Sequence, residues 1–354
     1  MTTTLLDGIT ATEVATDRLR ANVLERPAGV AEGGEAGTIV FIHGNVSSSS
    51  FWQPTMLRMP QEYRCIAIDL RGFGDSETLD VDATRGLADY SDDVASVVAA
   101  MGIGSAHFVG WSMGGGVVQQ LMLDHIALIA TVTLQAPVSP YGFGATAGPE
   151  GRLVTSDAAG SGAGGANPDF VSRLAAGDTT ADEQTSPRAV YRTAYVAAGF
   201  ESELEDLWVE SMLTTKTGEG NYPGNSVPSE NWPGFAPGDR GVLNTMAPTF
   251  FNTSGIVELE RKPRVLWIRG LDDAIVSDAS FFDLNYLGQI GVIPGWPGEE
   301  LAPAQPMVSQ TRAVLEAYAT AGGEFREVAL ESCGHSPHLE HPDSFDGALL
   351  AHIR

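Results

Sequence analysis

The chain has 354 residues, of which 43% are hydrophobic and 18% are charged, values typical of a globular protein and not of a disordered or fibrous one. Its 20 Lys and Arg against 45 Asp and Glu give a formal net charge of -25, a field that repels phosphate backbones and anionic lipid heads. Nucleic acid is therefore excluded as an expected partner. No apolar run approaches the roughly 18 residues of a membrane-spanning helix, so we expect no span.

Short apolar runs that suit buried parallel strands alternate with amphipathic segments of helical length, the pattern of a sheet covered by helices on both faces. Ahead of them, residues 9–25 alternate as an antiparallel edge hairpin would. The predicted core strands follow at 38–42, 65–69, 106–110, 131–135, 264–270 and 327–331. The predicted core helices are 86–101, one that begins near Met113, 308–320 and 344–353. The predicted fold class is α/β.

Between residues 139 and 255 this rhythm breaks. Gly, Ala and Ser dominate 142–166, Pro and Gly crowd 221–241, and three segments of helical character lie between them, at 168–176, 187–198 and 201–215. We expect a mainly helical cap over 139–255, inserted between the core parts 1–138 and 256–354. A second insertion is expected at about 280–306. The alternative for the cap, a poorly ordered linker, is disfavoured by its aromatic content.

The first ten residues contain no Lys or Arg, and only Leu5 and Leu6 form an apolar element, so they lack the parts of a secretory signal. Cys65 and Cys333 match no metal spacing, which favours buried structural thiols. We expect a cytoplasmic protein with no metal and no cofactor. A mature form that has already lost its signal is the alternative, and a homo-oligomer stays an open option.

Residues 110–114 read Gly-Trp-Ser-Met-Gly and lie between a predicted strand and a predicted helix. In this strand-turn-helix context, G-x-S-x-G pushes a serine out at the carboxyl edge of the sheet, and the flanking glycines relieve the crowding of the sharp turn. Backbone N–H groups at the helix start favour developing negative charge. Ser112 is thus the predicted nucleophile, and a purely structural glycine-rich turn is the alternative.

With this motif and three others in order, the sequence resembles the α/β-hydrolase family. His43-Gly44-Asn45 follows the first core strand as the family's HG loop does, and residues 69–76 are similar to its D-x-R-G-x-G-x-S segment. The resemblance is close over 38–137 and from 261 to the C-terminus. It implies an oxyanion hole formed by the backbone N–H groups of Asn45 and Met113. We interpret Asp69, Arg71 and His43 as residues that organise these loops.

A serine hydroxyl needs a base that is itself oriented. The family pattern G-H-x-x-x-x-E-x-P selects His335 as this base over its neighbours His338 and His341, which we expect to be exposed or packed in the loop. The acid should end the preceding strand, where Asp272 and Asp273 are adjacent candidates. The family spacing G-x-x-D-x-x-V selects Asp273 and leaves Asp272 as a turn former.

The resemblance implies a serine hydrolase that cleaves a small-molecule carboxylic ester or lactone with an apolar or aromatic group. Haloalkane dehalogenases and epoxide hydrolases have an HG run similar to residues 43–52, but they attack with an aspartate where this chain has Ser112. One alternative is a carbon–carbon bond hydrolase of a diketone, whose anionic substrate would need Arg188 or Arg192 as a partner. The other is a non-catalytic small-molecule binding protein on the same fold.

The aromatic residues near the predicted site are candidates for its walls. The candidate pocket residues are Trp52, Trp111, Phe281, Phe282 and Tyr286. The second insertion would then narrow the site for an apolar or aromatic group. The alternative is that these rings bury the insertion against the core.

Overall fold

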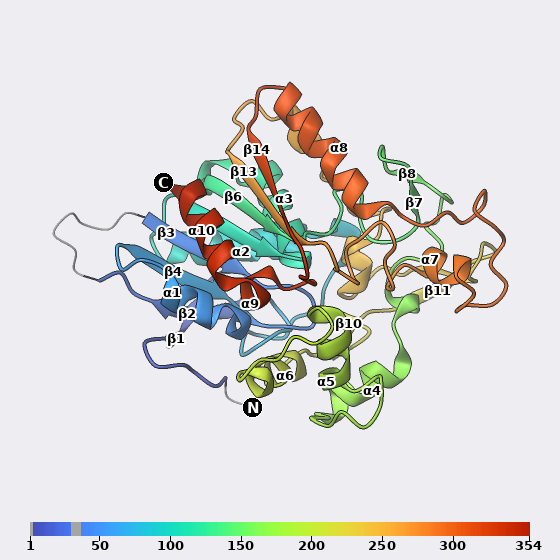
Figure 1. Cartoon of the computed structure of the whole chain (residues 1–354), viewed down its shortest axis with the longest axis horizontal. Helices are drawn as coiled ribbons and strands as arrows, with labels where there is room; N and C mark the ends of the chain where they lie inside the picture. The colour runs from blue at the N-terminus through green and yellow to red at the C-terminus, as the bar shows by residue number, and fades with distance from the viewer. Residues whose placement is uncertain (1–2, 30–36) are drawn as a thin grey trace.

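The computed structural model describes residues 3–29 and 37–354. Within this part, an eight-stranded sheet has the order β1-β2-β4-β3-β5-β6-β13-β14 (Figure 1). Its parallel strands are β3 (Gly37–Ile42), β4 (Tyr63–Ile68), β5 (Ala106–Trp111), β6 (Ile129–Gln135), β13 (Val265–Gly270) and β14 (Phe325–Leu330). At one edge, β1 (Thr10–Ala15) and β2 (Arg20–Arg26) form an antiparallel hairpin, and β2 pairs antiparallel with β4. The predicted α/β class and edge hairpin are confirmed.

Helices cover both faces of the sheet, which explains why its central strands read as continuous apolar runs and bury nearly every residue. One face packs against α2 (Ala88–Ala100), α3 (Met113–Asp124) and α8 (Met307–Thr320). The other packs against α1 (Gln53–Arg58), α9 (Pro337–Glu340) and α10 (Pro342–Ile353). Short 3-10 turns lie at Ser49–Trp52, Ala83–Arg85, Ile126–Leu128, Ala163–Gly165, Leu243–Met246 and Ser254–Glu258.

The segment 139–255 contains three short helices and three two-stranded ribbons. The helices are α4 (Pro168–Ala176), α5 (Pro187–Val190), which continues as a π-helical turn over Tyr191–Tyr195, and α6 (Glu205–Leu213). The ribbons pair β7 (Thr146–Ala147) with β8 (Arg152–Leu153), β9 (Thr217–Gly218) with β10 (Tyr222–Pro223), and β11 (Ser226–Pro228) with β12 (Phe235–Pro237). In Figure 1 these three helices gather together beside the sheet, and α7 (Leu284–Gln289) belongs to the second insertion.

Both cysteines are buried and unpaired. Burial raises the pKa of Cys65 to about 11 and also raises the pKa of Cys333, so both thiols stay protonated at neutral pH. Among the described residues, no group of His, Cys, Asp and Glu is placed to hold a metal ion. In the same part of the chain, no helix combines the length and apolar character that a membrane span requires.

Candidate active site

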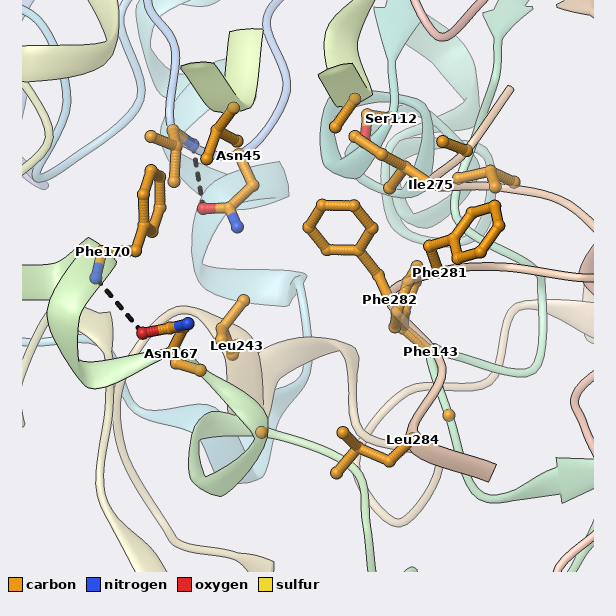
Figure 2. Close-up of a pocket in the computed structure, with 18 of the residues that line it drawn as sticks. Asn45, Ser112, Phe143, Asn167, Phe170, Leu243, Ile275, Phe281, Phe282 and Leu284 are labelled. Atoms are coloured by element: carbon orange, nitrogen blue, oxygen red, sulfur yellow. Dashed lines mark hydrogen bonds between the residues drawn. The ribbon is translucent and has the colours of Figure 1, made fainter. Parts of the chain in front are cut away.

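Ser112 occupies the turn between β5 and α3 alone, with φ 57° and ψ -119°. This conformation is strained for a residue with a side chain, and surrounding contacts must hold it. The Ser112 N–H donates to the carbonyl oxygen of Gln135 at the end of β6, over 2.9 Å. The Ser112 side chain is partly exposed, lines a cavity, and makes no hydrogen bond to any described residue (Figure 2). Its hydroxyl is therefore free to meet a ligand.

Two glycines let the chain close around this turn. A Cβ on Gly110 would collide with the backbone of Gly114, and a Cβ on Gly114 would collide with the carbonyl oxygens of Ile42 and His43. Glycine is the residue that permits such close backbone approach. The spacing of the motif thus reflects the packing of β5, α3 and the end of β3 against one another.

His335 and Asp273 are brought together from loops far apart in the sequence. His335 Nδ1 lies 2.8 Å from Asp273 Oδ2, and both side chains are 2% exposed. The other carboxylate oxygen accepts the N–H groups of Ile275 and Val276 over 2.8 Å and 3.0 Å. Because Nδ1 faces a carboxylate, it carries the imidazole proton and leaves Nε2 as the acceptor. The adjacent Asp272 is exposed.

Glu340 fixes the loop that carries His335. Its carboxylate accepts the N–H groups of Gly334, over 2.9 Å and 3.0 Å, and of Ser336, over 3.1 Å. It also accepts the N–H of Ala197 from the segment 139–255 over 2.7 Å. One side chain therefore ties the histidine loop to the segment 139–255.

The loop after β3 lies directly against the nucleophile turn, since a Cβ on Gly44 would be 3.0 Å from Ser112 Cβ. Among the described residues, the N–H of Asn45 has no acceptor. Met113 is the first residue of α3, so its N–H has no acceptor inside the helix. Two backbone donors are thus unengaged next to Ser112.

His43 determines which way the Asn45 N–H points. His43 Nε2 accepts the N–H of Leu70 over 3.0 Å, so Nδ1 carries the proton and donates to the Gly44 carbonyl oxygen over 2.7 Å. Burial lowers the pKa of His43, which keeps the ring neutral. The Ser47 hydroxyl donates to the same Gly44 oxygen over 2.8 Å. In a trans peptide the C=O and N–H point in opposite directions, so holding the Gly44 oxygen also orients the Asn45 N–H.

The residues predicted to organise these loops are engaged in structural contacts. Asp69 is fully buried and accepts the N–H of Ser49 over 2.7 Å and the amide of Asn22 over 2.8 Å. Arg71 donates two hydrogen bonds to Asp93, over 2.5 Å and 2.7 Å. These buried polar groups satisfy one another and connect the two loops to β2 and α2.

A cavity of about 780 Å³ lies over Ser112 and His335. Its walls come from the core, from the segment 139–255 and from the second insertion, which contributes Phe281 and Phe282 (Figure 2). Trp111 also lines it. No Asp, Glu, Lys or Arg occurs among its described lining residues. The site therefore suits an uncharged ligand.

Two of the candidate pocket residues do not line this cavity. Trp52 is fully buried, with its ring 5.0 Å from Phe41 and 4.4 Å from the imidazole of His338. Tyr286 packs edge-on against Phe281, with ring centres 5.7 Å apart, and is not among the described residues that line the cavity. Both residues are close in sequence to segments that do reach the site, but the direction in which each ring points depends on the local turn and cannot be predicted from that closeness.

Arg188 and Arg192 are also absent from the cavity walls. Each pairs with Glu205, over 2.6 Å and 2.7 Å, and Arg188 additionally pairs with Asp206. Their charges are therefore neutralised within the segment 139–255. His338 is 1% exposed and packs between aromatic rings, and burial lowers its pKa well below its usual value. It is a neutral core residue.

Tyr195 is a site residue that the sequence did not indicate. It comes from the π-helical turn, and its hydroxyl lies 2.9 Å from the carbonyl oxygen of Asn45 and 3.1 Å from that of Val46. Its ring packs edge-on against Trp111 and His335. The only signal for it in the sequence was the aromatic content of the segment.

Comparison with known proteins places the chain in a family. The model of the alpha/beta hydrolase family matches residues 39–348. The chain belongs to this family. Its members share the strand-turn-helix that carries the nucleophile, which agrees with the geometry of Ser112.

Among curated proteins, the chain is 39% identical over 113 residues to the dihydrolipoyllysine-residue acetyltransferase component of the acetoin cleaving system of Cupriavidus necator, covering 32% of this chain and 29% of that protein. It is 35% identical over 102 residues to a pimeloyl-[acyl-carrier protein] methyl ester esterase of Aliivibrio salmonicida, covering 28% and 36%. The chain thus spans about a third of the length of the curated relatives it matches.

Solved structures resemble it over nearly its whole length. A carboxylesterase from Bacillus subtilis has a TM-score of 0.59 at 15% identity, with 98% of this chain and 91% of that chain covered. An enol-lactonase from Burkholderia xenovorans has a TM-score of 0.57 at 16% identity, with 97% and 99% covered. At these identities the likeness shows the fold.

Proposed function

We propose that this α/β-hydrolase cleaves an uncharged carboxylic ester or lactone through an acyl-enzyme on Ser112. The observation that carries the proposal is the hydrogen bond between His335 and Asp273, because His335 lines the same cavity as Ser112. A nucleophile in a strained turn, a base with an oriented imidazole and two unengaged backbone donors are the parts that acyl transfer requires.

In this mechanism Ser112 Oγ attacks the carbonyl carbon while His335 Nε2 takes its proton. Hydrogen bonds between nucleophile and base are often completed only when substrate is bound, which accommodates the unpaired hydroxyl of Ser112. Asp273 stabilises the imidazolium, and the N–H groups of Asn45 and Met113 donate to the oxyanion. The imidazolium then protonates the departing alkoxide, and the acyl group stays on Ser112.

Water completes the cycle. His335 removes a proton from the water as its oxygen attacks the acyl carbon, and the same two N–H groups bind the second oxyanion. Collapse of this intermediate returns the proton to Ser112 Oγ and releases the acid. For a lactone, alcohol and acid leave as one hydroxy acid.

The cavity favours this reaction over carbon–carbon bond hydrolysis of a diketone. A diketone substrate is usually anionic and needs a cation, but Arg188 and Arg192 are paired with Glu205 and stand outside the cavity lining. A net charge of -25 adds repulsion at long range. An uncharged ester needs no cation in the cavity and is not repelled by the net charge.

The proposal is tested by hydrolysis of p-nitrophenyl butyrate by the wild type, Ser112→Ala and the matched control Ser96→Ala on α2. We expect Ser112→Ala to lose at least about 10⁴-fold in kcat, because the hydroxyl is the group that forms the covalent bond. Ser96→Ala should match the wild type. Comparable turnover by Ser112→Ala would refute the proposal.

A further inference from the structure

The cavity over Ser112 has two unlike walls (Figure 2). One, here called the apolar wall, consists of Phe143, Ile275, Phe281, Phe282 and Leu284. The opposite side holds Asn45 and Asn167 beside Phe170 and Leu243, and Tyr222 joins it through its ring contact with Phe170. The polar residues of this side, Asn45, Asn167 and Tyr222, are here called the donor wall. An apolar pocket with a few placed polar groups is the usual form of a specific small-molecule site.

Both asparagines of the donor wall present their NH₂ groups to the cavity. Asn45 Oδ1 accepts the N–H of Val46 over 3.0 Å, and Asn167 Oδ1 accepts the N–H groups of Asp169 and Phe170 over 2.9 Å and 3.4 Å. A backbone N–H can bond only the oxygen of an amide, so these bonds decide which end is nitrogen. In Figure 2 each nitrogen points away from its bonded N–H, into the space between the walls.

Tyr222 adds a third donor. Its ring packs edge-on against Phe170, with ring centres 6.4 Å apart, and its hydroxyl has no hydrogen-bond partner among the described residues. Burial raises the pKa of Tyr222, so the hydroxyl keeps its proton. The hydroxyls of Ser161 and Thr193, which also line the cavity, instead donate to backbone carbonyls over 2.8 Å. The Thr185 hydroxyl donates to Asp169, whereas the carboxamide of Gln184, which also lines the cavity, is exposed and has no partner among the described residues. Apart from this amide and the Ser112 hydroxyl, the free side-chain donors of the described lining belong to the donor wall.

We propose that the substrate carries, in addition to its scissile ester, a second uncharged acceptor oxygen that the donor wall binds, while an apolar group of the same molecule lies on the apolar wall. The acceptor is a ketone, ether, ester or amide oxygen. This inference rests on the proposed function. It names the class of ester and assigns Asn167 and Tyr222 as specificity-determining residues.

Two other ligand classes fit the walls less well. A carboxylate would be desolvated with no cation among the described lining residues. A plain hydrocarbon chain would displace water from the amide and hydroxyl donors without replacing its hydrogen bonds. An uncharged oxygen satisfies the donors and brings no charge into the cavity.

The test uses pairs of p-nitrophenyl esters that differ at one remote atom. In p-nitrophenyl 6-oxoheptanoate and 8-oxononanoate a ketone oxygen stands where the 6-methylheptanoate and 8-methylnonanoate partners have a methyl group. The ketone is too far from the ester carbonyl to change its reactivity. For each pair the quantity measured is the ratio of kcat/KM for the ketone to kcat/KM for the methyl partner.

In at least one pair we expect this ratio to fall by about 3- to 10-fold in Tyr222→Phe and in Asn167→Ser, the loss of one hydrogen bond. Serine keeps an acceptor at the start of α4, so the helix retains its cap. The matched control is Thr193→Val, which removes a cavity hydroxyl whose proton is already donated, and its ratio should stay within about 2-fold of the wild type.

Ratios that stay at the wild-type value in both Tyr222→Phe and Asn167→Ser, for both pairs, would overturn the inference. An equal fall of the ratio in Thr193→Val would also overturn it, since the preference for the ketone would then depend on the overall polarity of the cavity and not on the donor wall. Each variant is first labelled with a fluorophosphonate, and Asn167→Asp replaces any Asn167→Ser that does not label. Absence of hydrolysis and of a Ser112 adduct in the wild type would instead refute the proposed function.

Discussion

Trp111 Nε1 donates a hydrogen bond to the backbone carbonyl oxygen of His335 over 2.8 Å. Trp111 ends β5 immediately before Ser112, and its ring centre lies 5.6 Å from that of His335. The strand that delivers the proposed nucleophile therefore also holds the main chain of the proposed base. Trp111 and His335 are 224 residues apart in the sequence, and this hydrogen bond joins their two segments next to Ser112.

Trp111→Phe keeps an aromatic ring in this place, removes the indole N–H donor and reduces the ring volume, and the volume change is matched in the control below. We expect kcat to fall about tenfold with KM little changed, because a freed His335 loop displaces the imidazole from its reactive position. Steady-state kinetics with p-nitrophenyl butyrate checks this. The matched control is Trp267→Phe, whose buried indole N–H has no partner in the described structure and whose kcat should not change. Equal kcat for Trp111→Phe and wild type would contradict the positioning role.

His43→Gln tests the orientation of the Asn45 N–H. A glutamine oxygen can still accept the Leu70 N–H, but glutamine has a carbon atom where His43 has Nδ1 and therefore no donor at the position that faces the Gly44 oxygen. We expect kcat to fall by about 10- to 100-fold at similar KM, less than the loss of a whole oxyanion donor. Ser47→Ala removes the other bond to the same oxygen and should have a smaller effect. An effect on KM alone would argue against this role of His43.

Asp273→Asn and Asp272→Asn form a matched pair one residue apart. In Asp273→Asn the His335 imidazole loses its anionic partner, and the tautomer with the proton on Nδ1 is no longer favoured, so kcat should fall by about 10⁴-fold. Asp272 is exposed, and its replacement should leave kcat unchanged. Kinetics of the two variants would speak against the assignment if Asp272→Asn were the slower enzyme.

Phe282→Ala opens the apolar wall. Since one methylene in an apolar pocket is worth about 1–3 kcal/mol, kcat/KM for p-nitrophenyl octanoate should drop by at least about 10-fold, and that for the acetate by much less. Leu301→Ala is the control, because Leu301 is 65% exposed in the same insertion and does not line the cavity. Equal losses for both esters would show that Phe282 only supports the fold.

Asp283 should make the second insertion sensitive to pH. It accepts the N–H groups of Asn285 and Gln305 over 3.1 Å and 2.7 Å, and burial raises its pKa from 3.8 to about 6. Because the folded protein holds the Asp283 proton more tightly than the unfolded chain, protonation of Asp283 contributes about 3 kcal/mol to the free energy of unfolding below about pH 4. This contribution is lost as the pH rises through 6.

The measurement for Asp283 is the free energy of unfolding in urea for the wild type and Asp283→Asn at pH 4, 5 and 7. The difference between the two proteins should shift in favour of Asp283→Asn as the pH rises across this window. A difference that is constant with pH would contradict the raised pKa.

The sequence predicted the sheet well for a physical reason. The central strands are buried on both faces and are continuous apolar runs, whereas the edge strand β14 is only partly buried and contains charged residues. All six core strands were placed within two residues of their observed ends. The close contact of Gly110, Gly114 and the end of β3 leaves a local glycine spacing that can be read directly. The choice of Asp273 over Asp272 needed the family's spacing, because two adjacent carboxylates look alike in a sequence.

The cavity walls could not be predicted in the same way. Trp52 and Tyr286 were expected in the pocket, but Trp52 is buried in the core and Tyr286 contacts Phe281 without lining the cavity. Asn167 caps α4 and Tyr195 lies in the π-helical turn after α5, both in or next to helical segments that the sequence located, but the local pattern does not say how these segments pack around Ser112. Such positions depend on tertiary packing, which overrides local pattern.

The most direct test of the central claim is intact mass spectrometry after treatment with a fluorophosphonate, for the wild type and Ser112→Ala. An activated serine forms one covalent phosphonyl adduct, so we predict a single added mass on the wild type and none on Ser112→Ala. No adduct on the wild type would contradict the account and favour a binding protein on this fold. An adduct that persists in Ser112→Ala would place the nucleophile elsewhere.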